Sequence, residues 1–204
     1  MKTKEKIILK SIEMFNSKGI SKVTIRHIAN ELGISHGNLG YHFKSKGLIV
    51  SEIYNRMVEE INNLVLPPNS ESLTLNHYNI LLLQVLNFQK KYIFFYLDLI
   101  EIFRLFPEIA KKHEKTYTLR IAQNQKLFQN FIEQNLIKPE SQTGTYNRVI
   151  HTTWMLINFW ISQQWVFQTE SPVLQTHFTL RQLWDLLIPH LTEKGKIEYQ
   201  NLNL

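Results

Sequence analysis

Hydrophobic positions recur with the period of an α-helix along most of this chain. Ile8, Ile12 and Phe15 lie four and three residues apart, so they share one face of a helix that reaches about Lys18. Gly19 follows at the position where a left-handed residue ends many helices. The pattern therefore predicts that the chain begins with an amphipathic helix.

Two short helices are expected next, separated by a glycine. Thr24 can cap the second helix, and Gly33 ends it. Ser35 can cap a third helix from His36 to about Phe43. A turn this short prevents the second and third helices from packing antiparallel. The two helices therefore predict a helix-turn-helix in which the later helix, from His36 to about Phe43, projects one face outward. An ordinary helical corner is the alternative.

The remaining pattern predicts longer helices and no strand. A fourth helix begins near Lys46 and cannot pass Pro67. Further helices are expected over residues 72–91, 92–106, 107–137, 145–169 and 171–192, followed by a frayed tail over 196–204. The sequence therefore predicts an all-α fold, with a helix-turn-helix module over residues 1–47 and a larger helical body over 48–204.

The composition excludes several classes of protein. The chain has no cysteine, which removes disulfide scaffolds, thiolate zinc sites and cysteine nucleophiles and favours a cytoplasmic location. No charge lies between Arg148 and Glu170, but Asn158 and Ser162 interrupt this stretch. A membrane-spanning helix needs about 20 predominantly apolar residues, so no membrane contact is expected.

The positive charge is confined to the first quarter of the chain. The net charge is +6, and residues 1–50 hold nine lysines and arginines against three acids, whereas the other 154 residues hold 14 of each. Aromatic residues are distributed in the opposite way, since only three lie before residue 51. A small basic module joined to a neutral, aromatic-rich body indicates a polyanionic partner for the module. A solvated basic surface is the alternative.

One continuous segment resembles a known family. Residues 24–35 read TIRHIANELGIS, and residues 37–39 and 41–46 read GNL and YHFKSK. Over roughly residues 4–50 the chain resembles the DNA-binding domain of TetR-family bacterial transcriptional regulators. The resemblance implies a helix-turn-helix DNA-binding domain over residues 1–47 and a larger helical ligand-binding and dimerisation domain over 48–204. It further implies a ligand-responsive regulator, most simply a repressor, that binds a near-palindromic double-stranded DNA operator as a dimer. The chain departs from the family at Gly40, where a tyrosine usually contacts a phosphate.

The expected DNA contacts lie within the helix-turn-helix and directly after it. Lys46 begins the fourth helix, whose positive end favours a phosphate, and Thr24 can add a phosphate contact to its role as a cap. Arginine suits guanine and asparagine suits adenine in the major groove, which makes Arg26 and Asn38 candidates for base contacts. The expected DNA-binding residues are Thr24, Arg26, His36, Gly37, Asn38, Tyr41, His42 and Lys46. A plain surface role is the alternative for each.

The larger domain carries many aromatic residues at helical spacing. Ligand cavities are mostly apolar with a few polar groups, so we expect a lipophilic, largely uncharged small-molecule effector there. The expected ligand-binding residues are Tyr78, Phe95, Asp98, Phe103, Tyr117, Gln123, Trp154 and Asn158. Packing in a hydrophobic core is the alternative for any one of the aromatic residues.

The uncharged helix expected over 145–169 has more apolar surface than one core face can cover. It includes Trp154, Phe159, Trp160 and Trp165. Large apolar surfaces of this kind are typical of obligate interfaces, so we expect a homodimer formed through residues of about 145–192.

Catalysis has no support in the sequence. Paired carboxylates at helical spacing, a nucleophile beside a base and a Gly-rich phosphate loop are all missing, and the eight histidines lack the spacing of metal ligands. We therefore expect no enzyme activity, no cofactor and no metal. A helical small-molecule-binding or interaction module, with a decayed DNA-binding head marked by Gly40, remains the alternative function.

Overall fold

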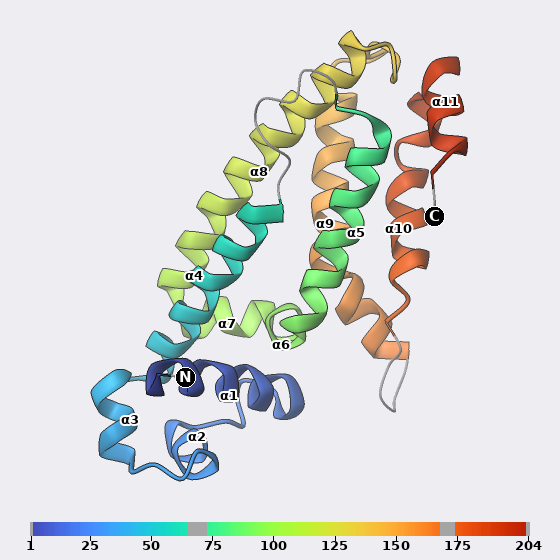
Figure 1. Cartoon of the computed structure of the whole chain (residues 1–204). Coiled ribbons are helices and arrows are strands. Elements are labelled where there is room, and N and C mark those ends of the chain that lie inside the picture. Colours follow the sequence, from blue (N-terminus) through green and yellow to red (C-terminus); the bar gives the residue numbers. More distant parts are fainter. Residues whose placement is uncertain (1, 65–72, 168–173, 203–204) are drawn as a thin grey trace. The chain divides into compact units, whose positions relative to one another are not determined.

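The structure is a computed structural model that describes residues 2–64, 73–167 and 174–202 (Figure 1). Its contacts divide the chain into two compact units. Unit 1 comprises Met1–Asn63 and Lys91–Glu114, and unit 2 comprises Leu64–Lys90 and Lys115–Leu204. The predicted domain boundary after residue 47 stays a prediction, because these units are defined by contacts and not by function.

Unit 1 contains the helix-turn-helix and the helices that pack with it. Its elements are α1 (Thr3–Lys18), α2 (Ile25–Glu31), α3 (His36–His42), α4 (Lys46–Leu64), α6 (Ile93–Leu97), α7 (Leu99–Leu105) and the beginning of α8 (Pro107–Glu133). The predicted apolar face of α1 is confirmed, since Ile8, Ile12 and Phe15 are all buried. Phe15 contacts Phe94 of α6 with ring centroids 5.2 Å apart.

Unit 2 contains the rest of α8 and a group of helices held by buried polar contacts. Its other elements are α5 (Leu75–Lys91), α9 (Thr145–Phe167), α10 (Thr176–Asp185), the 3₁₀ helix η1 (Ile188–His190) and α11 (Glu193–Gln200). Figure 1 shows α5, α9 and α10 side by side. Gln89 of α5 donates to the carbonyl of Ile157 at 2.8 Å, and the Trp184 indole donates to Asn79 at 2.9 Å. These bonds fix α9 and α10 against α5.

The predicted all-α class is confirmed. The described residues form helices and one isolated antiparallel bridge between Ile137 and Leu191. Within the described ranges, every helix is too short or too polar to cross a membrane.

Two expected helices differ from the observed ones in their interior or end. The helix expected over 92–106 is two helices, α6 and α7, which meet at Asp98. The helix expected over 107–137 ends at Glu133, and Asn135 follows with a left-handed φ of 57°. The helix expected over 72–91 begins at Leu75, and residue 72 lies outside the described residues.

The C-terminal region differs most from the prediction. The start of the helix expected over 171–192 lies outside the described residues, and the observed α10 ends at Asp185 before η1. The frayed tail expected over 196–204 is wrong as far as Gln200, because these residues belong to α11. Thr192 caps α11 by accepting from the Gly195 N–H at 3.0 Å.

Candidate nucleic-acid interface and ligand cavity

Helix α2 begins with the cap that the sequence predicts. The Thr24 hydroxyl accepts from the His27 N–H at 3.2 Å, and His27 Nδ1 accepts from the Thr24 N–H at 3.4 Å. The two residues thereby form a reciprocal capping box. Thr24 and Arg26 are both exposed, so each is available to a partner outside the chain.

The turn between α2 and α3 has the geometry of a helix-turn-helix. Gly33 adopts a left-handed φ of 63°, and the Ile34 N–H donates to the Ala29 carbonyl at 3.0 Å. The Ser35 hydroxyl then accepts from the Asn38 N–H at 3.1 Å, which starts α3. Ala29 is buried where the helices meet. The predicted motif is therefore confirmed in its turn, its cap and its small residue.

Helix α3 presents an exposed outer face. Leu39 is fully buried, and Phe43 after the helix is nearly so. Tyr41 is 86% exposed, which is unusual for an aromatic residue in a folded domain. Five of the sequence-predicted DNA-binding residues belong to this helix, and they are His36, Gly37, Asn38, Tyr41 and His42.

Lys46 has a partner that sequence spacing did not reveal. Its ammonium group donates to the Ile20 carbonyl at 2.9 Å, in the turn between α1 and α2. Burial lowers the pKa of Lys46, while the Glu101 carboxylate acts in the opposite direction. A phosphate contact by Lys46 therefore requires its side chain to leave or share this carbonyl.

Asp98 contacts the same turn. Its Oδ2 atom accepts from the Ile20 N–H at 2.8 Å, so one peptide unit on each side of Ile20 is held by a charged side chain. Asn16 of α1 adds a second attachment, because its amide donates to the Lys91 carbonyl and accepts from the Phe94 N–H. Sequence reasoning placed Asp98 in a ligand site and missed Asn16, whose partners lie more than 70 residues away in the chain.

Two other predicted ligand-binding residues lie in unit 1. Phe95 and Phe103 contact each other with ring centroids 6.1 Å apart, and both contact the imidazole of His113. Tyr54 of α4 completes this aromatic cluster, with its hydroxyl 3.3 Å from His113 Nδ1. Burial lowers the pKa of His113 to about 4, so the ring is neutral at pH 7.

The remaining predicted ligand-binding residues lie in unit 2. Tyr117 of α8 contacts Trp154 of α9 at 5.4 Å and hydrogen-bonds His151 Nδ1 at 2.7 Å. Gln123 accepts from the guanidinium of buried Arg120 at 2.8 Å. Tyr78 and Asn158 are buried, and burial strongly raises the pKa of the Tyr78 hydroxyl. The structure thus brings Tyr117 and Trp154 together, while Asp98 is engaged elsewhere.

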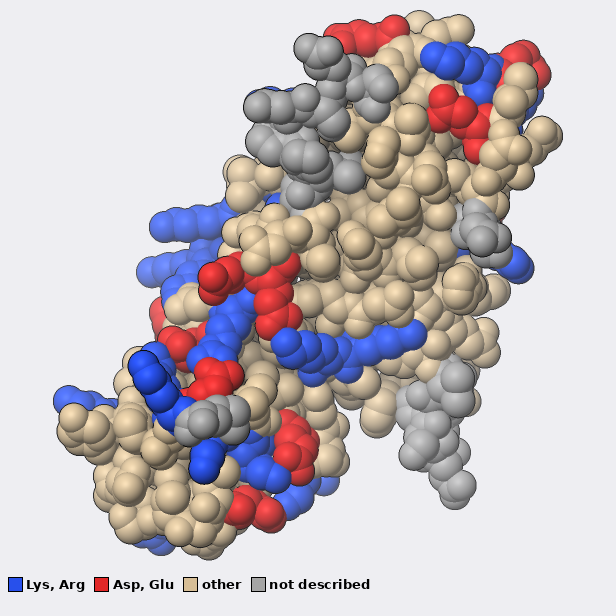
Figure 2. Space-filling view, in the orientation of Figure 1, with Lys and Arg blue, Asp and Glu red and all other residues tan. Residues whose placement is uncertain are grey.

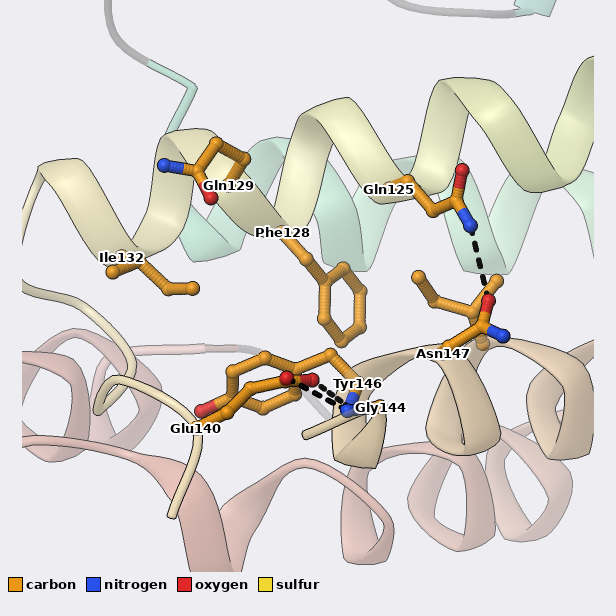
Figure 3. Close-up of a pocket in the computed structure, with 9 residues that line it drawn as sticks. Gln125, Phe128, Gln129, Ile132, Glu140, Gly144, Tyr146 and Asn147 are labelled. Carbon is orange, nitrogen blue, oxygen red and sulfur yellow. Dashed lines mark hydrogen bonds between the residues drawn. The ribbon is translucent and has the colours of Figure 1, made fainter. Parts of the chain in front are cut away.

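Unit 2 also contains a cavity of about 310 Å³ between α8 and α9 (Figure 3). Its apolar walls include Phe128 and Tyr146, and Gln125 and Asn147, which are hydrogen-bonded to each other, also line it. Glu140 is its only charged lining residue. Both oxygens of Glu140 accept backbone N–H groups at the start of α9, and these bonds hold the pKa of its carboxyl below the usual value. None of the predicted ligand-binding residues lines this cavity.

Charged side chains are distributed unevenly over the surface. Figure 2 shows lysine and arginine together with acidic residues over the helices of unit 1. A broad surface without charged side chains covers much of α5 and α10 in the same view. Arg56 of α4 forms ion pairs with Glu5 at 2.8 Å and with Glu52 at 3.7 Å. Glu5 and Glu52 are thereby paired with a cation within unit 1.

Two protein-family models match the chain. The model described as bacterial regulatory proteins of the tetR family matches residues 7–53. A second TetR model, described as bacterial transcriptional repressor, matches residues 56–199. The first covers the helix-turn-helix, and the second covers more than half of the chain.

Two curated relatives each match a short part of the chain. The probable HTH-type transcriptional regulator YttP of Bacillus subtilis is 33% identical over 57 residues, which are 28% of this chain and 28% of the relative. The uncharacterized HTH-type transcriptional regulator YerO of the same organism is 54% identical over 43 residues, which are 21% of this chain and 15% of the relative. The chain therefore matches less than a third of the length of these relatives.

Solved structures match nearly the whole chain. A TetR-family transcriptional regulator from Marinobacter aquaeolei VT8 has a TM-score of 0.87 and 27% identity, with 98% of this chain and 96% of that chain covered. A transcriptional regulator from Saccharomonospora viridis, solved in complex with choline, has a TM-score of 0.72 and 18% identity, with 93% and 97% covered. The second likeness concerns the fold alone.

Proposed function

Because this chain belongs to the TetR family of bacterial transcriptional regulators, we propose that it is a ligand-responsive repressor that binds a near-palindromic DNA operator as a homodimer. The observation that carries this proposal is the outer face of α3. Asn38 and Tyr41 are exposed there, while Leu39 anchors the helix in the core. A helix held in this way can enter the major groove with its exposed face toward the base edges.

The proposed DNA contacts divide into two kinds. Arg26, His36 and Asn38 contact base edges, because their donors and acceptors match groups in the major groove. The second kind consists of phosphate contacts, which position the head without reading sequence, and we assign them to Thr24, Tyr41, His42 and Lys46. Gly37 contributes its backbone.

The proposed effector is a lipophilic, largely uncharged small molecule bound in the larger domain. Two observations in unit 2 support this class. Tyr117 and Trp154 form an aromatic pair beside His151, and the cavity between α8 and α9 has apolar walls with several amide groups. Such a mixture of apolar walls and few polar groups is typical of small-molecule sites. The effector acts by changing the separation of the two DNA-binding heads in the dimer.

DNA binding as a function of salt tests the proposed function. We expect the full chain to bind DNA from upstream of its own gene, with an affinity that falls steeply as salt rises, because phosphate contacts release counterions. Lys46→Ala should weaken binding about equally on all sequences, whereas Asn38→Ala should change the sequence preference. Fluorescence anisotropy with operator variants separates the two effects. A wild-type chain that binds no duplex would contradict the proposal and favour a decayed DNA-binding head.

A further inference from the structure

Helix α7 lies against the first turn of α4, which begins with Lys46 (Figure 1). The ring of Phe106, directly after α7, packs so closely on Gly47 that a Cβ atom there would lie 3.1 Å from its Cδ1 atom. At the other end of α7, Asp98 accepts from the Ile20 N–H at 2.8 Å. Gly47 adjoins Lys46 in the chain and Ile20 holds its ammonium group, so α7 contacts a neighbour of Lys46 at both ends.

Glu101 lies on the part of α7 between these two contacts, about one helical turn after Asp98. The residue is half-buried. Its carboxylate acts electrostatically on Lys46, because burial lowers the pKa of Lys46 and Glu101 opposes that effect. None of the ion pairs among the described residues includes Glu101, so its charge stays available to Lys46.

Two groups of the chain attract the ammonium group of Lys46. The Ile20 carbonyl accepts from it at 2.9 Å, and the Glu101 carboxylate supplies the opposite charge without a direct contact. Attraction between charges extends beyond contact distance in a partly buried site, where water and salt screen it less. A DNA phosphate must therefore compete with both groups for the same cation.

We propose that Glu101 is a positioning residue that keeps Lys46 on the Ile20 carbonyl and thereby weakens the binding of the chain to DNA. This inference rests on the DNA-binding function proposed above. Phosphate contacts contribute affinity without reading the sequence. Glu101 therefore sets how tightly the chain binds any duplex, although it lies on α7, outside the helix-turn-helix.

The experiment is a double-mutant cycle on the full chain that combines Glu101→Gln with Lys46→Ala. Glutamine keeps the size of the side chain and removes its charge. We expect Glu101→Gln to tighten binding to a duplex selected by the wild type and to an unrelated duplex alike, by about twofold to fivefold at low salt. The gain should shrink as salt rises. In the Lys46→Ala background, the same substitution should change the affinity much less, because the two residues act through each other.

Glu108→Gln is the matched control. Glu108 is an exposed acidic residue in the first turn of α8 and also belongs to unit 1. Its substitution removes the same charge, so it measures the general repulsion between acidic residues and DNA, and its gain should be smaller. Circular dichroism checks that each variant keeps its helices. A role of Glu101 in folding alone would not make the gain depend on salt and on Lys46.

The outcomes distinguish this inference from the proposed function. If the wild type binds DNA and Glu101→Gln binds it no more tightly, the role of Glu101 is overturned while DNA binding stands. A gain that matches Glu108→Gln, or that is as large in the Lys46→Ala background, overturns it equally. If Lys46→Ala binds like the wild type, the phosphate contact is wrong, and this inference fails with it. If the wild type binds no duplex, the proposed function itself fails.

Discussion

His113 illustrates how a single residue couples stability to pH. Its imidazole packs against Phe95 and Phe103 and hydrogen-bonds Tyr54, and burial lowers its pKa from 6.5 to about 4. The unfolded chain therefore binds a proton at this residue below about pH 6.5, whereas the folded chain does so only near pH 4. Stability must fall as the pH falls through this window, because protons favour the unfolded state.

We predict that His113→Gln removes part of this acid sensitivity. The wild type should lose about 2 kcal/mol of unfolding free energy through His113 between pH 7 and pH 4.5, and the variant should lose correspondingly less. Urea unfolding at several pH values measures the difference. The two proteins compared at pH 7.5 provide the control for the packing effect of the substitution. Parallel curves for both proteins down to pH 4.5 would contradict the prediction.

The sequence predicts local hydrogen bonds of the candidate site but not the bonds between residues far apart in the chain. The roles of Thr24 and Ser35 as caps were predictable, because each hydroxyl bonds an N–H three residues ahead. Lys46 and Asp98 contact Ile20 from 26 and 78 residues away. Contacts between residues so far apart leave no pattern in local sequence spacing, so the sequence predicts a phosphate role for Lys46 but not its bond to the Ile20 carbonyl.

At the level of elements, local signals decided which predictions succeeded. The ends of α1 to α3 follow from caps and from Gly19 and Gly33, whose φ angles are positive. The break between α6 and α7 and the helix α11 follow from tertiary contacts. The segment 91–98 is attached to α1 through Asn16 and Asp98, and Gly195 packs directly on the chain near Leu136. The spacing of hydrophobic residues along the chain indicates neither the attachment of segment 91–98 nor the packing of Gly195.

Helix α11 provides a prediction at this scale. A Cβ on Gly195 would lie 2.0 Å from the Leu136 carbonyl oxygen and 3.2 Å from Leu191 Cδ2. Gly195→Ala should therefore displace α11, although alanine favours helix elsewhere, and lower the unfolding free energy by about 1 to 3 kcal/mol. Chemical unfolding followed by circular dichroism measures this change. Gln200→Ala, at an exposed position of the same helix, should leave stability nearly unchanged, and an unaffected Gly195→Ala would refute the close contact.

For the whole molecule, the division between charged and apolar surface corresponds to two kinds of partner. The excess positive charge lies in residues 1–50, where the helix-turn-helix is formed. Large exposed apolar side chains gather instead on α9 and α10, and they include Met155, Phe159, Val166, Phe167 and Phe178. The basic surface of residues 1–50 favours a polyanionic partner. The exposed apolar side chains of α9 and α10 favour contact with a second copy of the chain.

The large apolar residues of α9 and α10 divide between the core of unit 2 and the exposed surface. Trp160 is only 4% exposed and donates its indole N–H to Gln89 at 2.5 Å, so it belongs to the core of unit 2. Leu183 is also buried. Met155, Phe159 and Val166 recur at helical spacing on α9 with at least 45% of each side chain exposed. A charge that tests the interface therefore belongs at Phe159 or Phe178.

We predict that Phe159→Glu and Phe178→Glu each convert the proposed dimer to monomers of about 24.3 kDa. A buried, unpaired carboxylate at an apolar interface costs several kcal/mol, which is enough to dissociate most dimers at micromolar concentration. Light scattering measures the mass, and circular dichroism confirms that each variant keeps its helices. Leu119→Glu, at an equally exposed position of α8 outside the proposed interface, should remain dimeric. If both α9 and α10 variants keep the wild-type mass, the interface lies elsewhere. If they become folded monomers, binding to the two half-sites of an operator should weaken while single heads keep their sequence preference, because only the dimer fixes the spacing between recognition helices.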